Sequence, residues 1–229
     1  MKAIILAAGK GSRIKEITDG KPKSFLRIGD KTIIQHQINV LKNSGIEKII
    51  IITGYKKDYF EDFKKDGIII LYNPFYEITN VLGSFWFAKD HLTEPFIFLH
   101  ADTYFHPKIL QLLKKYPGNN LAIELKKCGE EEMKVKIKEG LVIEISKEMT
   151  ESDGEFIGIA KIENFKEIKN IVEELIETNT TSFFEVTFTA LIKKGITFNV
   201  TDIGNLIWEE IDFKEDYNNL LTRLKLVKD

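Results

Sequence analysis

The chain has 229 residues, 43% hydrophobic and 30% charged, which is enough apolar material for one large α/β domain and argues against disorder. Its 33 basic and 35 acidic residues leave a formal charge of -2, so net positive charge cannot hold it to nucleic acid. The single cysteine, Cys128, excludes an intramolecular disulfide framework and a cysteine-based zinc cage. The longest apolar run is too short to span a bilayer, and we therefore expect a cytoplasmic protein without stable membrane insertion.

Strand-like and helix-like segments alternate through the first half of the chain. A β-branched apolar run predicts a strand at 2–6, and a polar loop follows it to about Lys23. Apolar residues at helical spacing then predict a helix over 32–44. The next predicted elements are a strand at 49–53, a short helix at 59–65, a strand at 68–72, a helix at 81–91 and a strand at 96–100. Continuous apolar strands separated by helices predict a Rossmann-like α/β fold, with a mostly parallel sheet and helices on both faces.

The second half is less regular. Partial alternation over 134–145 predicts two strands folded about Glu139-Gly140, hence a small antiparallel addition in the C-terminal half. The remaining predicted elements are a strand at 155–162, helices at 165–177 and 183–194, a strand at 197–201 and a closing helix at 213–227. With no repeat or Pro/Gly-rich linker, we expect a single domain over 1–229. Its nucleotide-binding half covers about 1–110 and its acceptor-binding half about 111–229. Whether the chain forms a homodimer stays an open question.

The most informative stretch is Leu6-Ala7-Ala8-Gly9-Lys10-Gly11-Ser12-Arg13, where small residues let backbone N–H groups approach a phosphate. It fails the P-loop pattern because Lys10 precedes a glycine rather than Ser or Thr, and the dinucleotide fingerprint because Ile14 stands at the third glycine position. Gly-x-Gly alone fits an ordinary tight turn equally well. The cations that follow, Arg13 and then Lys21-Pro22-Lys23, are what favour a triphosphate site.

This glycine stretch, followed by Lys21-Pro22-Lys23, resembles the signature of the sugar-phosphate and MobA-like NTP transferases, nucleotidyltransferases that activate phosphate monoesters. Further matches follow in the family's order: Asn73-Pro74-Phe75-Tyr76, Thr79-Asn80, Gly83-Ser84, Ala101-Asp102, Gly154-Glu155-Phe156-Ile157-Gly158 and Trp208-Glu209-Glu210-Ile211-Asp212. The set looks most like the small cytidylyltransferases of the phosphocholine and inositol-1-phosphate type. Segments 121–151 and 178–185 match no family feature.

The resemblance implies an enzyme that moves a nucleoside monophosphate from a triphosphate, with CTP favoured, to a small phosphomonoester such as phosphocholine, inositol 1-phosphate or a sugar phosphate. The attacking phosphate oxygen is already an anion, so positioning and electrostatics suffice without a general base. It implies Lys23 and Arg13 as catalytic residues. It assigns nucleotide binding to Leu6, Ala7, Ala8, Gly9, Lys10, Gly11, Ser12, Arg13, Lys23, Asn80, Ser84 and Ala101.

Two carboxylates, Asp102 and Asp212, are implied as ligands of Mg²⁺. Asp102 follows the strand at 96–100, and ligands of open α/β sheets bind beyond the carboxyl ends of strands, although a turn aspartate that bonds its own backbone fits the local sequence too. Asp212-Phe213-Lys214-Glu215 has the pattern of a capping box, and local sequence alone favours that alternative. Asn80 likewise fits the N-cap of the helix at 81–91 as well as a nucleotide contact.

The acceptor site is the part that the residues define least. Glu155, Glu185 and Trp208 are its candidates, because aromatic faces with carboxylates suit a quaternary ammonium through cation–π contact. A polyol phosphate or sugar phosphate would use the same acids as hydroxyl acceptors, and the choice stays open. Two other functions also stay open: a UTP- or GTP-dependent sugar-1-phosphate nucleotidyltransferase, and a nucleotide-binding regulatory homologue without turnover.

Overall fold

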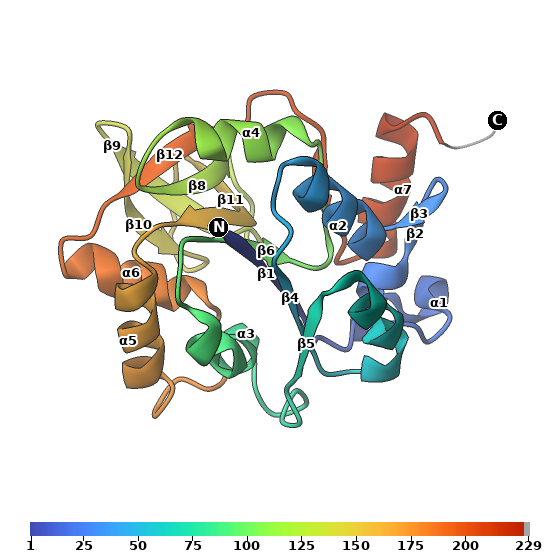
Figure 1. Cartoon of the computed structure of the whole chain (residues 1–229). Helices are drawn as coiled ribbons and strands as arrows, with labels where there is room; N and C mark the ends of the chain where they lie inside the picture. The colour runs from blue at the N-terminus through green and yellow to red at the C-terminus, as the bar shows by residue number, and fades with distance from the viewer. Residues whose placement is uncertain (227–229) are drawn as a thin grey trace.

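The computed structural model describes residues 1–226 of the chain. The helices are α1 Lys15–Thr18, α2 Ile33–Asn43, α3 Val81–Phe85, α4 Lys108–Lys115, α5 Phe165–Leu175, α6 Glu185–Lys193 and α7 Lys214–Arg223. The strands are β1 Lys2–Ala7, β2 Arg27–Ile28, β3 Lys31–Thr32, β4 Ile49–Thr53, β5 Ile69–Tyr72, β6 Phe96–His100, β7 Thr103–Phe105, β8 Asn119–Glu124, β9 Lys134–Lys138, β10 Leu141–Ser146, β11 Gly154–Ile162, β12 Phe198–Asp202 and β13 Trp208–Glu210. They build one nine-stranded sheet and two small two-stranded sheets (Figure 1).

The first half of the chain forms the parallel part of the large sheet, in the order β5-β4-β1-β6. The central strands β1, β4 and β6 are almost entirely buried, because they consist of the continuous apolar runs that a sheet covered on both faces requires. The predicted strands at 2–6, 49–53, 68–72 and 96–100 are confirmed. Their carboxyl ends meet at one edge of the sheet, at Ala7, Thr53 and His100.

The second half corrects the expectation of a mostly parallel sheet with a small antiparallel addition. Beyond β6 the order continues β11-β8-β12-β10-β9, and β9 also pairs with β11, which closes these five strands into a ring. The sheet is therefore mixed, with four parallel and five antiparallel pairings. The antiparallel strand β11 is buried along its whole length, so it has the same unbroken apolar pattern as a parallel strand.

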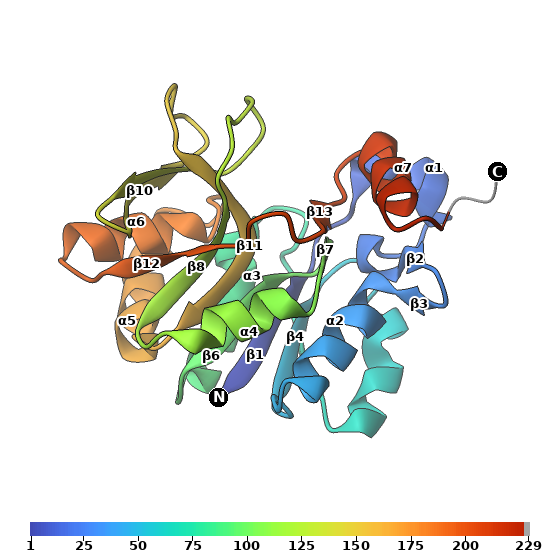
Figure 2. The ribbon, with the colours of Figure 1, turned by 90° about the horizontal axis from the view of Figure 1, so that it is seen from above.

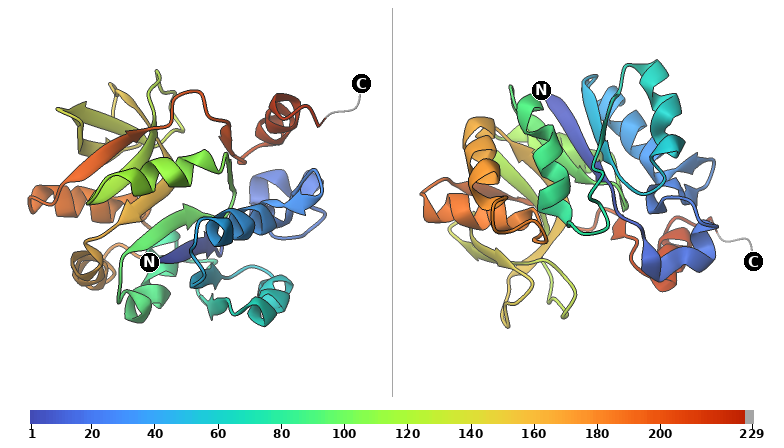
Figure 3. Two further views of the ribbon diagram at one scale, coloured as in Figure 1. Left: turned by 45° about the horizontal axis from the view of Figure 1, so that its top comes forward. Right: turned by 90° about the horizontal axis from the view of Figure 1, so that it is seen from below.

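Helices cover both faces of the sheet, as predicted (Figures 1 and 2). One core lies under α2 and α4, and a second lies under α3, α5 and α6. A third, smaller cluster joins Ile14 and Leu26 of the N-terminal loop to Ile211 and to Leu220 of α7. Figure 3 shows α7 beside this N-terminal segment in both views, which brings the two distant parts of the chain to one place.

Several element ends differ from the predictions. The segment expected as a helix over 81–91 is α3 followed by a 3₁₀ helix, Trp86–His91, and the short helix at 59–65 is a 3₁₀ helix, Lys57–Asp66. The closing helix α7 ends at Arg223, and Val227 of the predicted span lies outside the described residues. Within residues 1–226, no helix combines the length and the hydropathy needed to cross a membrane.

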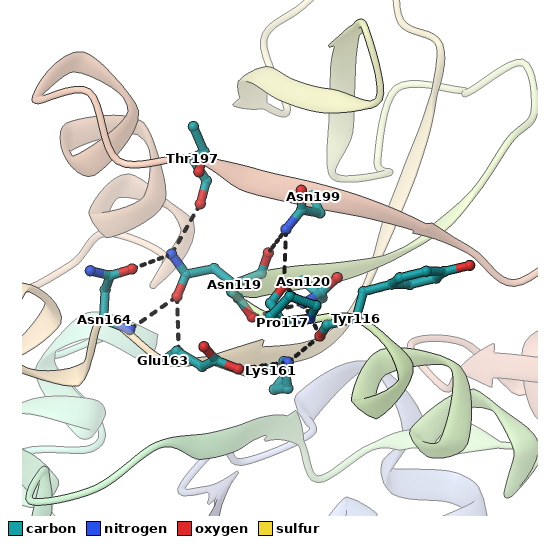
Figure 4. Close-up of polar contacts among 10 residues, drawn as sticks. Tyr116, Pro117, Asn119, Asn120, Lys161, Glu163, Asn164, Thr197 and Asn199 are labelled. Atoms are coloured by element: carbon teal, nitrogen blue, oxygen red, sulfur yellow. Dashed lines mark hydrogen bonds and ion pairs between the residues drawn. The ribbon is translucent and has the colours of Figure 1, made fainter.

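At the amino end of β8, far from the carboxyl edge of β6, a buried amide cluster ties the ring together (Figure 4). The Asn119 amide donates to Asn164 Oδ1 (2.8 Å) and to the carbonyl of Thr197 (3.0 Å). Its Oδ1 accepts from the backbone N–H of Glu163 (2.9 Å) and of Asn164 (3.1 Å). One side chain thus links β8, the start of α5 and the start of β12.

Candidate active site

Asp102 lies in the turn between β6 and β7, at the carboxyl edge of the sheet. The turn is held from α2 by Gln37, whose fully buried amide donates to the carbonyls of His100 (2.8 Å) and Thr103 (2.7 Å). The Asp102 backbone oxygen also accepts from the N–H of Ile211 (3.2 Å). Asp102 therefore sits on a fixed backbone rather than on a free loop.

Asp212 reaches the same edge because β13 pairs antiparallel with β7, in the register Glu210 with Thr103. It does not cap α7 with its side chain. Asp216 does so instead, because its Oδ2 accepts from the N–H of Asp212 (2.8 Å) and of Phe213 (2.6 Å). The expected capping box of Asp212 and Glu215 is therefore absent from α7 as described, and the Asp212 carboxylate is free to face Asp102.

Lys23 joins the two carboxylates. Its Nζ lies 2.8 Å from Asp102 Oδ2 and 2.5 Å from Asp212 Oδ1, and the lysine side chain is only 13% exposed. Burial disfavours the ammonium, but the two carboxylates outweigh that cost and hold the pKa of Lys23 above its usual value. Burial likewise disfavours the ionised form of Asp102, yet Lys23 and His100 lower the pKa of that carboxyl. Lys23 and Asp102 are therefore both charged at neutral pH.

The glycine loop lies directly against Lys23. Gly11 has φ +58°, and a Cβ there would approach Lys23 Cβ to 3.2 Å, so glycine serves both the turn and the close packing of the lysine. Within residues 1–226, the backbone N–H groups of residues 9–12 donate to no protein acceptor. Unused N–H groups beside a buried lysine are the donor set that binds phosphate oxygens.

Two adjoining hollows contain most of the residues predicted for the site. The glycine-loop hollow is lined by Leu6, Ala7, Gly9, Gly11, Ser12, Arg13, Pro22, Lys23, Ser24, Ala101, Asp102 and Asp212. The wide hollow shares Leu6, Gly9, Arg13, Asp102 and Asp212 with it and adds Ala8, Tyr76, Thr79, Asn80, Val81, Ser84, His100, Glu131, Lys147, Phe183 and Glu210. Segments from both ends of the chain therefore converge on one concave surface.

The remaining nucleotide candidates differ in how they are held. Arg13 lies over the Phe213 ring at 5.2 Å, whereas Lys10 is exposed, pairs with Glu77 at 3.2 Å and lines neither hollow. Asn80 caps α3, since its Oδ1 accepts from the N–H of Val81 (2.9 Å), and it also lines the wide hollow. Ser84 is buried beside Asn73, which donates to its Oγ at 3.0 Å.

Sequence reasoning missed a charged cluster behind Asp102. His100 Nδ1 lies 3.5 Å from Glu210 Oε1, and its Nε2 lies 3.7 Å from Glu185 Oε1. Burial disfavours the imidazolium, but Glu210 and Glu185 outweigh it and raise the pKa of His100 to about 9. Gly158 makes room for this ring, because a Cβ there would lie 2.8 Å from His100 Nδ1. A lone histidine at a strand end gave no motif by which to find the cluster.

The three acceptor candidates lie in different surroundings. Glu185 is buried beside His100, whereas Glu155 is buried against Lys126, whose Nζ lies 2.7 Å from its Oε2. Trp208 is buried, with the same lysine 5.5 Å from its ring centroid. None of the three lines either of the two hollows. Lys147, which the sequence did not single out, does line the wide hollow and lies over Phe183 at 4.9 Å.

The carboxylates Asp102 and Asp212 fit a hard divalent cation such as Mg²⁺, because both reach the one Lys23 ammonium and both offer oxygen ligands. A second group, His100 with Asp102 and Glu210, also brings its ligand atoms within 4.8 Å of one another. A metal at this second group would have to displace the proton that the raised pKa of His100 favours, because only a neutral imidazole coordinates a metal. The two aspartates are therefore the better ligand pair.

Comparison with known proteins gives several similarities. Over 105 residues the chain is 40% identical to a choline-phosphate cytidylyltransferase of Streptococcus pneumoniae, a match that covers 45% of each protein. It is 28% identical to a CTP:phosphoglutamine cytidylyltransferase of Campylobacter jejuni over 94% of this chain and 97% of that one. The solved structure of an inositol-1-phosphate CTP transferase from T. maritima covers 98% of this chain and 96% of its own with a TM-score of 0.83 and 23% identity, which shows the fold.

The family model of the MobA-like NTP transferase domain matches residues 3–125, more than half of the chain. The matched segment contains the glycine loop, Lys23 and Asp102, all of which line the glycine-loop hollow. The chain therefore belongs to the family of the MobA-like NTP transferase domain.

Proposed function

We propose that this protein transfers a nucleoside monophosphate from a nucleoside triphosphate, with CTP as the preferred donor, to a small phosphomonoester, and releases pyrophosphate. The observation that carries the proposal is the ammonium of Lys23 between Asp102 and Asp212, beside the free N–H groups of the glycine loop. CTP comes first because both cytidylyltransferase relatives, one matched over 94% of this chain, take their names from that class.

In the proposed reaction an oxygen of the acceptor phosphate attacks the α-phosphorus of the triphosphate. The bond from the α-phosphorus to the bridging oxygen breaks, and its electron pair leaves with pyrophosphate. No proton has to be removed from the nucleophile, so the residues of the site act by position and charge. Lys23 faces the oxygens on which charge accumulates, while the N–H groups of residues 9–12 and Arg13 hold the triphosphate.

Asp102 and Asp212 would hold Mg²⁺, which when bound supplies positive charge to the phosphate oxygens. The same carboxylates orient Lys23 through the contacts at 2.8 and 2.5 Å. Asn80 and Ser84, on the wall of the wide hollow next to Ala8, would contact the base or the ribose. The acceptor would enter the same hollow, which His100, Lys147 and Glu210 also line.

The test is a screen for pyrophosphate release, with four nucleoside triphosphates against a panel of phosphomonoesters. We expect turnover with CTP, loss of turnover on chelation and recovery with Mg²⁺. Asp102→Asn should abolish most of it, whereas Asp58→Asn, the same change at an exposed position away from the hollows, should not. Equal kcat/KM for CTP and UTP would reject the base preference. Triphosphate binding without any product would reject the catalytic proposal in favour of a regulatory homologue.

A further inference from the structure

A third hollow adjoins the wide one, between β10 and α6. Lys147 and Phe183 line both, so the two hollows meet at this pair. The β10–α6 hollow has an aliphatic part, formed by Met133, Ile145, Leu175, Val186 and Ala190, and a polar part, formed by Glu144, Ser146, Lys147, Glu148, Glu185, Thr189 and Lys193. Its aliphatic part is a place where the carbon atoms of an acceptor can leave water.

Glu185 lines this hollow, and its carboxyl group is directed toward His100. Only 3% of the residue is exposed, and its Oε2 has no hydrogen-bond partner within the described residues 1–226. Its other oxygen lies 3.7 Å from His100 Nε2. A buried carboxylate oxygen without a donor is costly, and an N–H or O–H group of a ligand is what removes that cost.

Phe183, which lines both the wide hollow and the β10–α6 hollow, already has one of the chain's own cations on its ring. Lys147 Nζ lies 4.9 Å from the Phe183 ring centroid. A quaternary ammonium is recognised by such faces and donates no hydrogen bond. It would have to displace a lysine and would still leave Glu185 Oε2 unpaired.

We propose that the acceptor passes Lys147 and Phe183, lays an aliphatic segment in the β10–α6 hollow and donates an N–H or O–H hydrogen bond to Glu185. The acceptor class is then a phosphomonoester whose far end carries a hydrogen-bond donor, an amine or a hydroxyl, rather than a quaternary ammonium. This inference rests on the proposed function, since it concerns the acceptor of that same reaction.

The first test uses the unmodified enzyme with CTP and a graded set of acceptors: phosphoethanolamine and its mono-, di- and trimethylated forms, the last being phosphocholine, with inositol 1-phosphate as the hydroxyl arm. We expect the largest single drop in kcat/KM, at least about tenfold, at the third methylation, because that step removes the last N–H and leaves Glu185 unpaired. Turnover of inositol 1-phosphate alone would identify the donor as a hydroxyl. Phosphocholine used as well as phosphoethanolamine and inositol 1-phosphate would overturn the inference.

The second test assigns the selectivity to Glu185. Glu185→Gln keeps the volume but removes the charge, and it should flatten the drop at the third methylation. Glu144→Gln makes the same change at an exposed position on the same hollow and should leave the drop in place. An unchanged drop in Glu185→Gln would show that another group reads the acceptor. Absence of pyrophosphate with every donor and acceptor would instead reject the proposed function. If Glu185→Gln does not fold, the methylation series with the unmodified enzyme still tests the inference.

Discussion

At the carboxyl end of β6 the sheet gathers ionised groups, whereas at the amino end of β8 it gathers amides beside a single lysine, Lys161, which is paired with Glu163. The first cluster contains Lys23, Asp102 and His100 and leaves His100 Nε2 and Glu185 Oε2 without hydrogen-bond partners among residues 1–226. In the second, all four hydrogen bonds of the Asn119 side chain are made to protein groups, and only the neighbouring Asn120 Oδ1 stays unpartnered in the same described range.

The difference between the two clusters shows that buried polar groups can serve two purposes, structural or functional. Amides whose donors and acceptors are satisfied fix the positions of strands at little electrostatic cost. Buried charges whose oxygen or nitrogen atoms lack hydrogen-bond partners lower the stability of the protein unless a ligand supplies those partners. Such clusters are therefore typical of functional sites. Changes at the carboxyl edge should therefore act on turnover and pH dependence, and changes at the amino edge on stability.

The largest expected effect at the carboxyl edge is that of Lys23→Ala. In the proposed reaction the lysine faces charge that builds up in the transition state, so its loss should lower kcat by roughly 10²–10³ and raise the KM for nucleotide less. Steady-state kinetics, with circular dichroism to verify folding, measure this. Lys21→Ala removes an exposed lysine of the same motif and should retain most of the rate. A change confined to KM in Lys23→Ala would make the lysine a binding residue.

The second effect is a pH dependence of stability. The pKa of His100 is about 9 in the folded protein against an ordinary value of 6.5, so the folded state binds more protons than the unfolded state between these values. Its contribution is complete below pH 6.5 and is lost as pH rises toward 9, by about 3 kcal/mol in the free energy of unfolding. Urea titrations at several pH values should show this slope in the parent protein and a flatter one in His100→Asn. Equal slopes would place the proton elsewhere.

At the amino edge, Asn119→Ala tests the amide cluster. It leaves the N–H of Glu163, the N–H of Asn164 and the carbonyl of Thr197 without their partner, and should lower the free energy of unfolding by about 2 kcal/mol. The kcat and KM of the folded fraction should stay unchanged, because the cluster lies at the opposite end of the sheet from Asp102. A loss of kcat without a loss of stability would contradict the separation of the two edges.

The smallest effect should come from Arg13→Ala. The side chain is 55% exposed and lies on the Phe213 ring, so it contributes to holding the triphosphate more than to the transition state. We expect the KM for nucleotide to rise about tenfold, the loss of one exposed charge-assisted contact, with kcat little changed. A fall in kcat as large as that in Lys23→Ala would give Arg13 a direct part in the chemistry.

Most strands in the first half of the chain could be predicted from the sequence. Strands such as Ile49–Thr53 are apolar on both faces and are followed by a glycine or a polar turn residue. The strand Asn119–Glu124 was missed because it begins with two asparagines, which are uncommon in strands. Here the Asn119 side chain forms hydrogen bonds to residues that are distant in sequence. Ring closure through β9 and β11 was beyond reach, since a buried antiparallel strand and a buried parallel strand have the same apolar pattern.

The site divides in the same way. The nucleotide-binding candidates within the first hundred positions could be placed from a resemblance, and ten of these eleven line one hollow or the other, as do Ala101, Asp102 and Asp212. His100 and Lys147 carry no local pattern, because their roles arise from packing between strands and helices that are distant in sequence. Glu210 lies in a segment that matches the family, but nothing in that match distinguished it from its neighbours. Asp212 shows the opposite problem, as its local pattern indicates a cap that Asp216 supplies instead.

The contact between Lys23 and Asp212 spans 189 positions of sequence and has a consequence for biosynthesis. As the ribosome releases the chain, β1, β4 and β6 can assemble around Lys23 and Asp102 long before β13 and α7 emerge. Until then the second carboxylate and the packing of Ile211 and Leu220 against Ile14 are missing. A nascent chain can thus assemble its parallel strands early, while the proposed site stays incomplete until β13 and α7 have been made.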